Sequence, residues 1–269
     1  MSPPHLISAV ALAMVSAAHG AVVNIDFSAL PTSADRFNGE AAAPDPAGSA
    51  ALWNNIVEAA GSLSVTGLDD STGATADWGI TISGFLNTRK SASEQEVQDI
   101  WPGAASYKRL MEDYLQLDSG ANSSVTTASG QITGLRAGWT YDLYFYGQGS
   151  DMSGTDASSS GENSLFTVNS VSKQTGWDGV EGGDRSLAEG IEYVKFSAVA
   201  DGNGRIHFTW SNVVAGINAE IDQVTSNTNT GSRYAALNGM QIVEGVPEPS
   251  TSLLALPGFA GLLLRRRRA

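Results

Sequence analysis

The sequence predicts an all-β protein, a single jelly-roll-like antiparallel β-sandwich that carries one or two short helices. The chain has 269 residues, which is enough for one large β domain and too few for two. Its 30 Gly residues and its 16% of charged residues favour short strands joined by turns over amphipathic helices. Several segments also alternate apolar and polar residues, which is the period of a half-buried strand.

The first half of the chain contains three predicted strands and two predicted helices. Val22 to Phe27 alternates as VVNIDF and begins the domain as a strand. Ala50 to Ala60 is compatible with a short helix, although its Trp-Asn-Asn run is also typical of a turn. Leu63 to Thr66 and Trp78 to Ile82 read as strands of a meander. Ala104 to Tyr114 follows a Pro-Gly pair and is predicted to be the main helix.

From Leu115 to Glu244 every predicted element is a strand, and a long polar loop is predicted over Gly147 to Asn163. The strongest segment is Thr140 to Tyr146, TYDLYFY, because it alternates and is rich in aromatic residues. The Asp201 to Gly204 sequence DGNG is a hairpin turn signal between two other strands. The remaining predicted strands are Leu115 to Leu117, Ser124 to Thr133, Leu165 to Asn169, Ile191 to Ala198, Arg205 to Trp210 and Tyr234 to Glu244.

Two patterns within this domain resemble known β-sandwiches. Leu135-x-x-Gly138-x-x-Tyr141 has the spacing of the tyrosine corner of Greek-key sandwiches, which implies a structural role for Tyr141. The opening strand, the Gly-x-x-Tyr-Asp-Leu strand and the closing Ala235 to Val243 strand together resemble galactose-binding-like or carbohydrate-binding jelly-roll domains. This resemblance implies no binding residue that can be carried over to a numbered position.

Composition excludes several kinds of function. Cysteine is absent, so disulfides, thiolate metal sites and Cys nucleophiles cannot contribute. Removing Glu248 and the four C-terminal arginines from the 28 acidic and 15 basic residues leaves 27 and 11, a formal charge of −16. Nucleic acid and anionic lipid both bind through Lys and Arg, so this charge argues against either as a partner.

Residues 1–20 are predicted to form a signal peptide with a hydrophobic helix, which directs the chain into the secretory pathway. Leu6 to Ala18 is an apolar stretch of signal-peptide length and is too short to span a bilayer comfortably. Ala18 and Gly20 then stand in the −3 and −1 relation that signal peptidase accepts. We therefore expect cleavage before Ala21 and a β-sandwich ectodomain over residues 21–245.

Residues 246–269 combine a Pro-Glu-Pro motif, a hydrophobic segment and an arginine cluster. The segment Leu253 to Leu264 would form a short hydrophobic helix, and the arginines would hold its end on the cytoplasmic side. The motif is Pro247, Glu248 and Pro249, and the cluster is Arg265, Arg266, Arg267 and Arg268. This tail resembles the PEP-CTERM sorting signal of exported bacterial proteins. The resemblance implies transient inner-membrane insertion, removal of the tail by an exosortase, and delivery to the cell surface or extracellular matrix.

Few residues suggest catalysis or ligand binding. His207 is the one histidine outside the signal segment, and its place opposite Ile206 and Phe208 favours an exposed or edge-packed strand residue over a catalytic triad. Trp177 and Asp178, in a Gly-rich loop, form the best candidate sugar-binding platform, with loop packing as the alternative. Trp53 and Trp101 are weaker platform candidates, whereas Trp139 and Trp210 are predicted to pack in or cap the core.

No cofactor is predicted, but a structural calcium ion is compatible with several loops that are rich in oxygen ligands. None of these loops has the full EF-hand pattern, and turn capping is the alternative for each acidic residue. The candidate pairs are Asp69 and Asp70, Asp151 and Asp156, Asp201 and Asn203, and Glu220 and Asp222.

The sequence therefore favours an exported, non-enzymatic protein of the cell surface or matrix that is processed by an exosortase and associates with polysaccharide. The alternative is a secreted carbohydrate-binding module or carbohydrate-active enzyme. A glycosidase would need two carboxylates at a set separation, and the sequence does not show that geometry.

Overall fold

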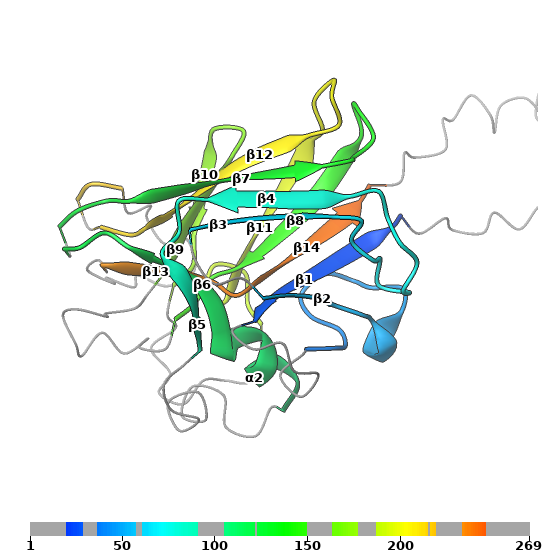
Figure 1. Ribbon diagram of the computed structural model, residues 1–269, viewed down its shortest axis with the longest axis horizontal. Helices are drawn as coiled ribbons and strands as arrows, with labels where there is room; N and C mark the ends of the chain where they lie inside the picture. The colour runs from blue at the N-terminus through cyan, green and yellow to red at the C-terminus, as the bar shows by residue number, and fades with distance from the viewer. Residues whose placement is uncertain are drawn as a thin grey trace, which may run out of the picture.

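The computed structural model describes nine stretches of the chain and shows the all-β sandwich that the sequence predicts (Figure 1). Residues 1–19 and 246–269, with the signal and sorting segments, lie outside the described residues, and so do Trp101, Trp177 and Asp178. The described residues are 20–28, 37–57, 61–90, 105–121, 123–149, 163–176, 187–214, 216–218 and 233–245.

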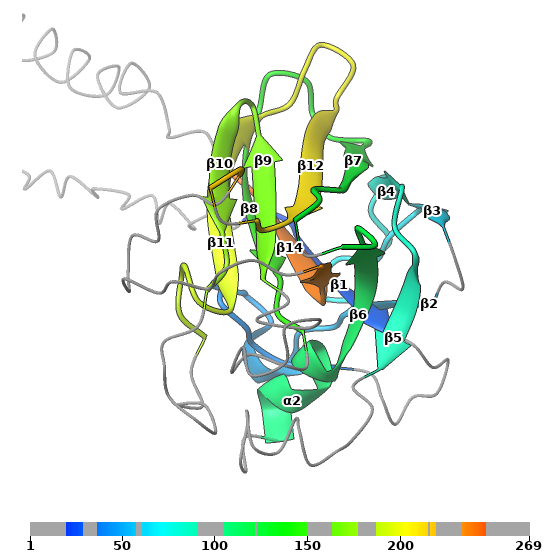
Figure 2. The same cartoon turned by 90° about the vertical axis from the view of Figure 1, so that its left-hand side faces the viewer.

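Two stacked sheets make the body of the sandwich, and we call them sheet A and sheet B. Sheet A has five strands in the order β11-β8-β14-β1-β2. Sheet B has six strands in the order β10-β9-β12-β7-β4-β3. The strands of both sheets are labelled in Figure 2. The strands of sheet A are β1 Val22–Ser28, β2 Asn54–Val57, β8 Thr140–Tyr146, β11 Tyr193–Val199 and β14 Gly239–Glu244. Those of sheet B are β3 Ser62–Thr66, β4 Gly79–Ser83, β7 Thr127–Thr133, β9 Ser164–Val168, β10 Val171–Gln174 and β12 Ile206–Asn212.

Eight of these strands are connected as a jelly roll. In chain order β1, β7, β8, β9, β10, β11, β12 and β14 alternate between the two sheets, except at the β9–β10 hairpin. The resulting four-stranded halves, β11-β8-β14-β1 and β10-β9-β12-β7, are antiparallel throughout. This arrangement of two facing antiparallel sheets confirms the jelly-roll prediction.

The other described elements extend this framework. Strand β2 pairs with β1 in the parallel direction, and β4 and β3 continue sheet B beyond β7. A third sheet, in the order β13-β6-β5, lies at the end of the sandwich that carries helix α2 (Figure 1). The bounds are β5 Asn87–Lys90, β6 Asp113–Asp118, β13 Tyr234–Leu237, α2 Ala105–Glu112 and the 3₁₀ helix η1 Gly48–Ala50.

Alternation along each strand separates the core from the outer faces. On β8, Tyr141, Leu143 and Phe145 point into the space between the sheets, where the Phe145 ring packs 4.9 Å from that of Phe166. On β7, Gly130 leaves room for the ring of Phe208, because an added Cβ would lie 2.0 Å from that ring. The core is therefore rich in aromatic residues, and its packing around Phe208 requires a glycine at position 130.

The predicted tyrosine corner is present. Between β7 and β8 the chain crosses from sheet B to sheet A, and the hydroxyl oxygen of Tyr141 accepts a hydrogen bond of 2.8 Å from the amide of Arg136. Burial raises the pKa of the Tyr141 hydroxyl, so the group stays neutral and acts as a fixed acceptor. The bond holds the crossover in place.

Three sequence predictions about single elements were wrong. Asp201 to Gly204 does form a turn, but the strands that it joins, β11 and β12, lie in different sheets and are not a hairpin. The expected helix over Ala50 to Ala60 is replaced by η1 and strand β2, because the Asn54 side chain bonds to the backbone of Asn24 at 2.9 Å and of Asp69 at 2.8 Å. The expected single strand over Tyr234 to Glu244 is two strands, since Asn238 turns its amide toward the carbonyls of Met111 and Asp113.

Candidate functional site

The outer face of sheet B is polar along most of its described strands. Inward positions carry core residues such as Ile80, Phe208 and Trp210, whereas the alternate positions face outward. Leu165 is an outward apolar exception on β9. We define the hydroxyl face as the outward residues Ser62, Ser64, Thr66, Thr81, Ser83, Thr127, Ser129, Gln131, Thr133, Thr167, Ser172, Gln174, His207 and Thr209.

Strand register places six hydroxyl side chains of this face in one line. Each residue is the direct cross-strand partner of the next, so the line crosses all six strands. Neighbouring strands lie about 4.8 Å apart, so the line is about 24 Å long. We call it the hydroxyl row, and it consists of Ser62, Ser83, Ser129, Thr209, Thr167 and Ser172.

A second line runs beside the hydroxyl row through Ser64, Thr81, Gln131 and His207. The Ser64 and Thr81 hydroxyls are 3.2 Å apart, and Gln131 Nε2 lies 3.1 Å from His207 Nε2. His207 is therefore on the exposed outer position that the sequence favoured for it, among amides and hydroxyls.

The hydroxyl face carries no Asp, Glu, Lys or Arg at its outward positions. Lys173 is the one such residue within the described strands of sheet B, and it lies on the other side of β10 from Ser172, 5.6 Å from the ring centroid of Phe196. The full chain has a formal charge of −13, so this face differs sharply from the rest of the molecule.

The outer face of sheet A is partly covered. Segment 37–53 and helix α2 contribute to a second core cluster around Phe37, Trp53, Leu110 and Tyr146, whereas Thr140, Ser197 and Val199 remain exposed elsewhere on this face. The rings of Phe37 and Trp53 pack edge to face with centroids 4.9 Å apart, and Trp53 Nε1 donates to the carbonyl of Gly39 at 3.0 Å. Trp53 is fully buried, so it cannot serve as the exposed sugar platform considered from the sequence.

A buried chain of hydrogen bonds fixes this cover to the sheet. The amide of Ala42 donates to the Tyr146 oxygen at 2.8 Å, and the Tyr146 hydroxyl donates to Gln241 Oε1. Gln241 Nε2 donates to Asn24 Oδ1 at 2.8 Å, and Asn24 Nδ2 donates to Asp45 Oδ2 at 2.9 Å. Burial raises the pKa of Tyr146 well above its usual value, which keeps this donor protonated. The polar groups on this face serve structure.

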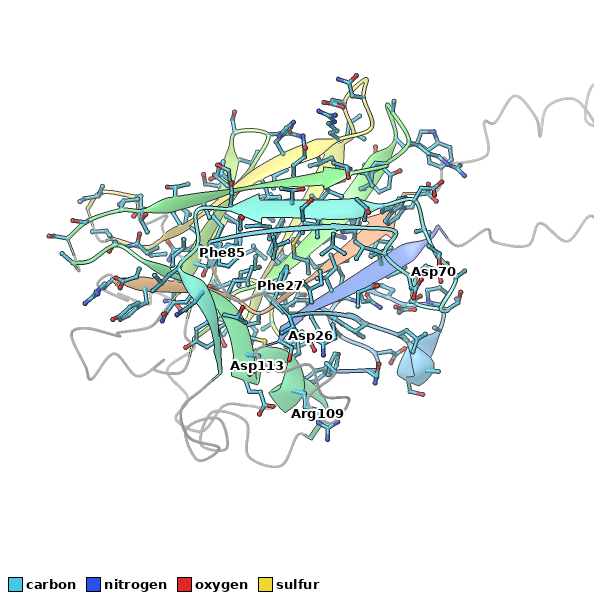
Figure 3. The ribbon with its side chains drawn as sticks, viewed as in Figure 1. Asp26, Phe27, Asp70, Phe85, Arg109 and Asp113 are labelled. Carbon is cyan, nitrogen blue, oxygen red and sulfur yellow. The ribbon has the colours of Figure 1, made fainter. Side chains whose placement is uncertain are left out.

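Two buried carboxylates, Asp26 and Asp113, lie near each other in Figure 3 at the end of the sandwich near α2. Their exposed fractions are 0% and 1%. Asp26 Oδ2 accepts from the amide of Phe37 at 3.1 Å, and Asp113 Oδ2 accepts from the Ser28 hydroxyl at 3.1 Å. These bonds tie segment 37–57 and β6 to β1, and the burial keeps both carboxylates away from an external substrate.

The described calcium candidates cap their own turns. Although burial by itself would raise the pKa of Asp70, hydrogen bonds from the Thr72 hydroxyl and from the amides of Ala74 and Thr72 lower it overall. Asp201 Oδ1 accepts from the amides of Asn203 at 2.8 Å and Arg205 at 2.9 Å. Among the described residues, no group of three or more His, Asp or Glu side chains is placed to hold a metal ion.

The other tryptophans divide as the sequence suggested. Trp210 is buried in the core, and Trp139 packs partly buried against it, with the Arg136 guanidinium 4.5 Å from its ring centroid. Asp151, Asp156, Glu220 and Asp222, like Trp177 and Asp178, lie outside the described residues. None of the described helices is both long enough and apolar enough to cross a bilayer.

Comparisons with known proteins identify no family for this chain. No family model and no curated protein matches it. Among solved structures, the enzymatically active domain of tailspike protein 4 from bacteriophage CBA120 aligns with 62% of this chain at 8% identity and a TM-score of 0.29. The chain spans 19% of the length of that structure. A likeness at this level carries no functional conclusion.

The sequence alone did not reveal the hydroxyl face. Its Ser and Thr residues are ordinary outward residues of alternating strands, and alternation was used only to locate strands. Their alignment into a row depends on the register of pairs as distant as Ser83 with Ser129. The sequence does contain one indication of this face, because the strands of sheet B have almost no charged residues. This indication can be recognised only after the strands have been assigned to sheets.

Proposed function

We propose that this chain is an exported, non-enzymatic protein of the cell surface or extracellular matrix that associates with polysaccharide through the hydroxyl face. The observation that carries this proposal is the presence of uncharged hydrogen-bonding side chains across sheet B, which are exposed on β3, β4 and β12, exposed or half-buried on β7, and half-buried on β9 and β10. Sugar polymers present many hydroxyl groups, each of which donates and accepts hydrogen bonds. A Ser or Thr hydroxyl has the same capacity, so the two surfaces match without charge.

Other partners fit this face less well. The central parts of protein interfaces are apolar and rich in aromatic residues, whereas the hydroxyl row contains only Ser and Thr. Nucleic acid and anionic membranes require Lys or Arg, which the outward positions of these strands lack. Asp26 and Asp113 do not suit a catalytic pair that acts on a polymer, because both carboxylates are buried.

Binding through exposed hydroxyls is expected to be weak for one protein molecule. A typical hydrogen bond contributes about 0.5–1.5 kcal/mol net, and association itself costs at least about 4 kcal/mol. Many copies along one polymer would raise the overall affinity through avidity. Such behaviour suits a matrix protein better than a receptor for a free sugar.

Binding can be tested with extracellular polysaccharide from the native host in affinity gel electrophoresis. The test variant Ser83→Ala, Ser129→Ala, Thr209→Val removes three hydroxyls from the row and keeps side-chain shape. The control, Thr140→Val with Ser197→Ala, removes exposed hydroxyls from sheet A. The loss of three bonds should weaken retardation at least about tenfold, whereas the control should run like the wild type. Equal retardation of all three proteins would contradict the role of the face.

Export and sorting are supported by the sequence of the two ends and need a separate test. Intact-mass analysis of protein from the host should show loss of residues 1–20 and of the segment after Pro249. A Pro247→Ala, Glu248→Ala, Pro249→Ala variant should keep its tail and stay in the membrane fraction. A native protein that still ends in Arg265 to Ala269 would contradict sorting and indicate a permanent anchor.

A further inference from the structure

Resting on the proposed function, we infer that the polymer bound by the hydroxyl face is a neutral polysaccharide whose chain runs along the hydroxyl row, across the strands. The inference narrows the ligand in two ways, by charge and by direction. Each follows from a different property of sheet B.

Charge selects a neutral polymer. An acidic polysaccharide needs cationic side chains to offset its repulsion from a protein with a formal charge of −13. The outward positions of sheet B contain neither Lys nor Arg, and Lys173 lies on the other side of β10. Carboxylates of the polymer would therefore meet hydroxyls, amides and the single imidazole of His207, within the negative field of the rest of the chain. A neutral polymer meets the same hydrogen-bonding groups without this repulsion.

Register selects the direction across the strands. Along the hydroxyl row, successive residues lie on strands about 4.8 Å apart and follow one another over six strands. At the β10 end of the row, the Thr167 and Ser172 hydroxyls are hydrogen-bonded to each other at 2.8 Å. Along a single strand, outward residues are about 6.7 Å apart, and the shortest strands offer only two or three. A chain across the strands therefore meets more hydroxyls at closer spacing than a chain along any one strand.

The hydroxyl row runs from one edge of sheet B to the other, which favours binding along a long polymer over binding of the terminal sugar of an oligosaccharide. The row begins at Ser62 on β3 and finishes at Ser172 on β10, and these are the two edge strands of sheet B. A long chain can therefore enter over one edge and leave over the other. Nothing in this arrangement depends on the terminal sugar.

Sheet twist favours a single flexible chain over a crystalline surface. Neighbouring strands rotate by about 20–25°, so the row curves strongly from β3 to β10. A flat polymer crystal would touch only a few neighbouring strands at once. A single soluble chain can follow the curve and keep all six contacts.

The test compares two soluble neutral polymers, a β-glucan and a galactomannan, each beside a form whose primary hydroxyls have been oxidised to carboxylates. Affinity electrophoresis of the full-length protein in mild detergent should show retardation by at least one neutral polymer and at least about tenfold weaker retardation by its oxidised form. Salt should reduce this difference, because it screens the repulsion.

Two pairs of variants test charge and direction. Thr209→Lys should improve binding to the oxidised polymer, whereas Ser197→Lys, on the outer face of sheet A, should not. Thr209→Val, within the row, should weaken binding to the neutral polymer, whereas Thr66→Val, an exposed residue of the same face outside the row, should leave it unchanged.

The outcomes separate this inference from the proposed function. Equal or stronger binding of the oxidised polymers would overturn the inference and leave polysaccharide binding intact. Binding of the native polysaccharide but of neither neutral polymer would also overturn it. Equal losses in Thr66→Val and Thr209→Val would overturn the assigned direction. If the native polysaccharide does not bind either, the proposed function itself fails.

Discussion

The outer faces of the two sheets differ in what lies on them. The outer face of sheet A carries a second core cluster, and that of sheet B carries mainly Ser and Thr side chains. On sheet A, the outward residues of β1, β8 and β14 include Asn24, Tyr146 and Gln241, and segment 37–57 buries them. On sheet B, the outward residues are mainly Ser and Thr, which are exposed on β3, β4 and β12, exposed or half-buried on β7, and half-buried on β9 and β10. Burial of an aromatic or amide side chain stabilises the fold when its polar atoms find hydrogen-bond partners, whereas small hydroxyl side chains are well solvated at the surface. The outward residue type therefore distinguishes the covered face from the bare one.

The largest expected effect is a difference in the free energy of unfolding between a substitution on sheet A and one on sheet B. Trp53→Ala removes the main side chain that covers sheet A and should reduce the free energy of unfolding by about 3–5 kcal/mol. Thr209→Val, on the bare face of sheet B, should change it by less than about 0.5 kcal/mol. Urea denaturation of both variants measures the difference, and similar midpoints would show that segment 37–57 adds little to stability.

A second pair of substitutions tests whether the stability of sheet B comes from its core-facing residues and not from its outward hydroxyls. Gly130→Ala places a Cβ 2.0 Å from the Phe208 ring and should destabilise the fold by about 1–3 kcal/mol. Ser129→Ala, the next residue along but outward, is the matched control and should be nearly neutral. An equally large loss in Ser129→Ala would mean that the hydroxyl face supports folding.

The tyrosine corner joins the two sheets, and its loss should affect both faces moderately. Tyr141→Phe leaves the amide of Arg136 without its 2.8 Å acceptor and should reduce the free energy of unfolding by about 0.5–1.5 kcal/mol. Tyr144→Phe, on the same strand but facing outward, provides a comparison. Thermal unfolding of the two variants should rank Tyr141→Phe as the less stable.

The smallest expected effect is a pH dependence confined to the side of sheet A. The turn at Asp70 precedes Ser71, whose amide and carbonyl bond to β1 and to Leu52. The folded-state pKa of Asp70 is below its ordinary value of 3.8, so its contribution to stability is full above that pH. The contribution is lost as the pH falls through the lowered pKa.

The melting temperatures of the wild type and Asp70→Asn, measured from pH 6 to pH 2, would therefore converge at the acid end. The expected difference is small because the carboxylate is largely solvated. A difference that grows on acidification would contradict the assigned hydrogen bonds. Polysaccharide binding by the hydroxyl face, which has no carboxylate at its outward positions, should not follow this titration.

Sequence patterns predicted the strands that face the core on one side. TYDLYFY and RIHFTW became β8 and β12, because their alternate residues fill the space between the sheets. The edge strand β10, VSKQ, was missed because it carries little apolar alternation. Strand β5, NTRK, was missed for the same reason. Edge and end strands are held by backbone pairing more than by burial, and pairing partners are distant in sequence.

The candidate site was less predictable than the fold. Asp69, Asp70, Asp201 and Asn203 were considered as calcium ligands, but the described turns use the three aspartate side chains locally, and Asn203 bonds to Asp201 through its backbone amide. The sugar platform proposed at Trp177 and Asp178 lies outside the described residues and stays a prediction. The hydroxyl face could not be recognised before register was known, because no single strand distinguishes a solvated face from a binding face.

The pairing of β1 with β14 also has a consequence for the order in which the protein can fold. Val22 lies opposite Val243, and the amide of Glu244 donates to the carbonyl of Ala21 at 2.9 Å. Strand β14 sits between β1 and β8, so sheet A has a gap at its centre until the last strand of the domain has been synthesised. Contacts of such long sequence separation form slowly. An exported chain would therefore cross the membrane with its first strand able to pair on one side only, with β2, and it would complete the sandwich only once residue 245 had emerged.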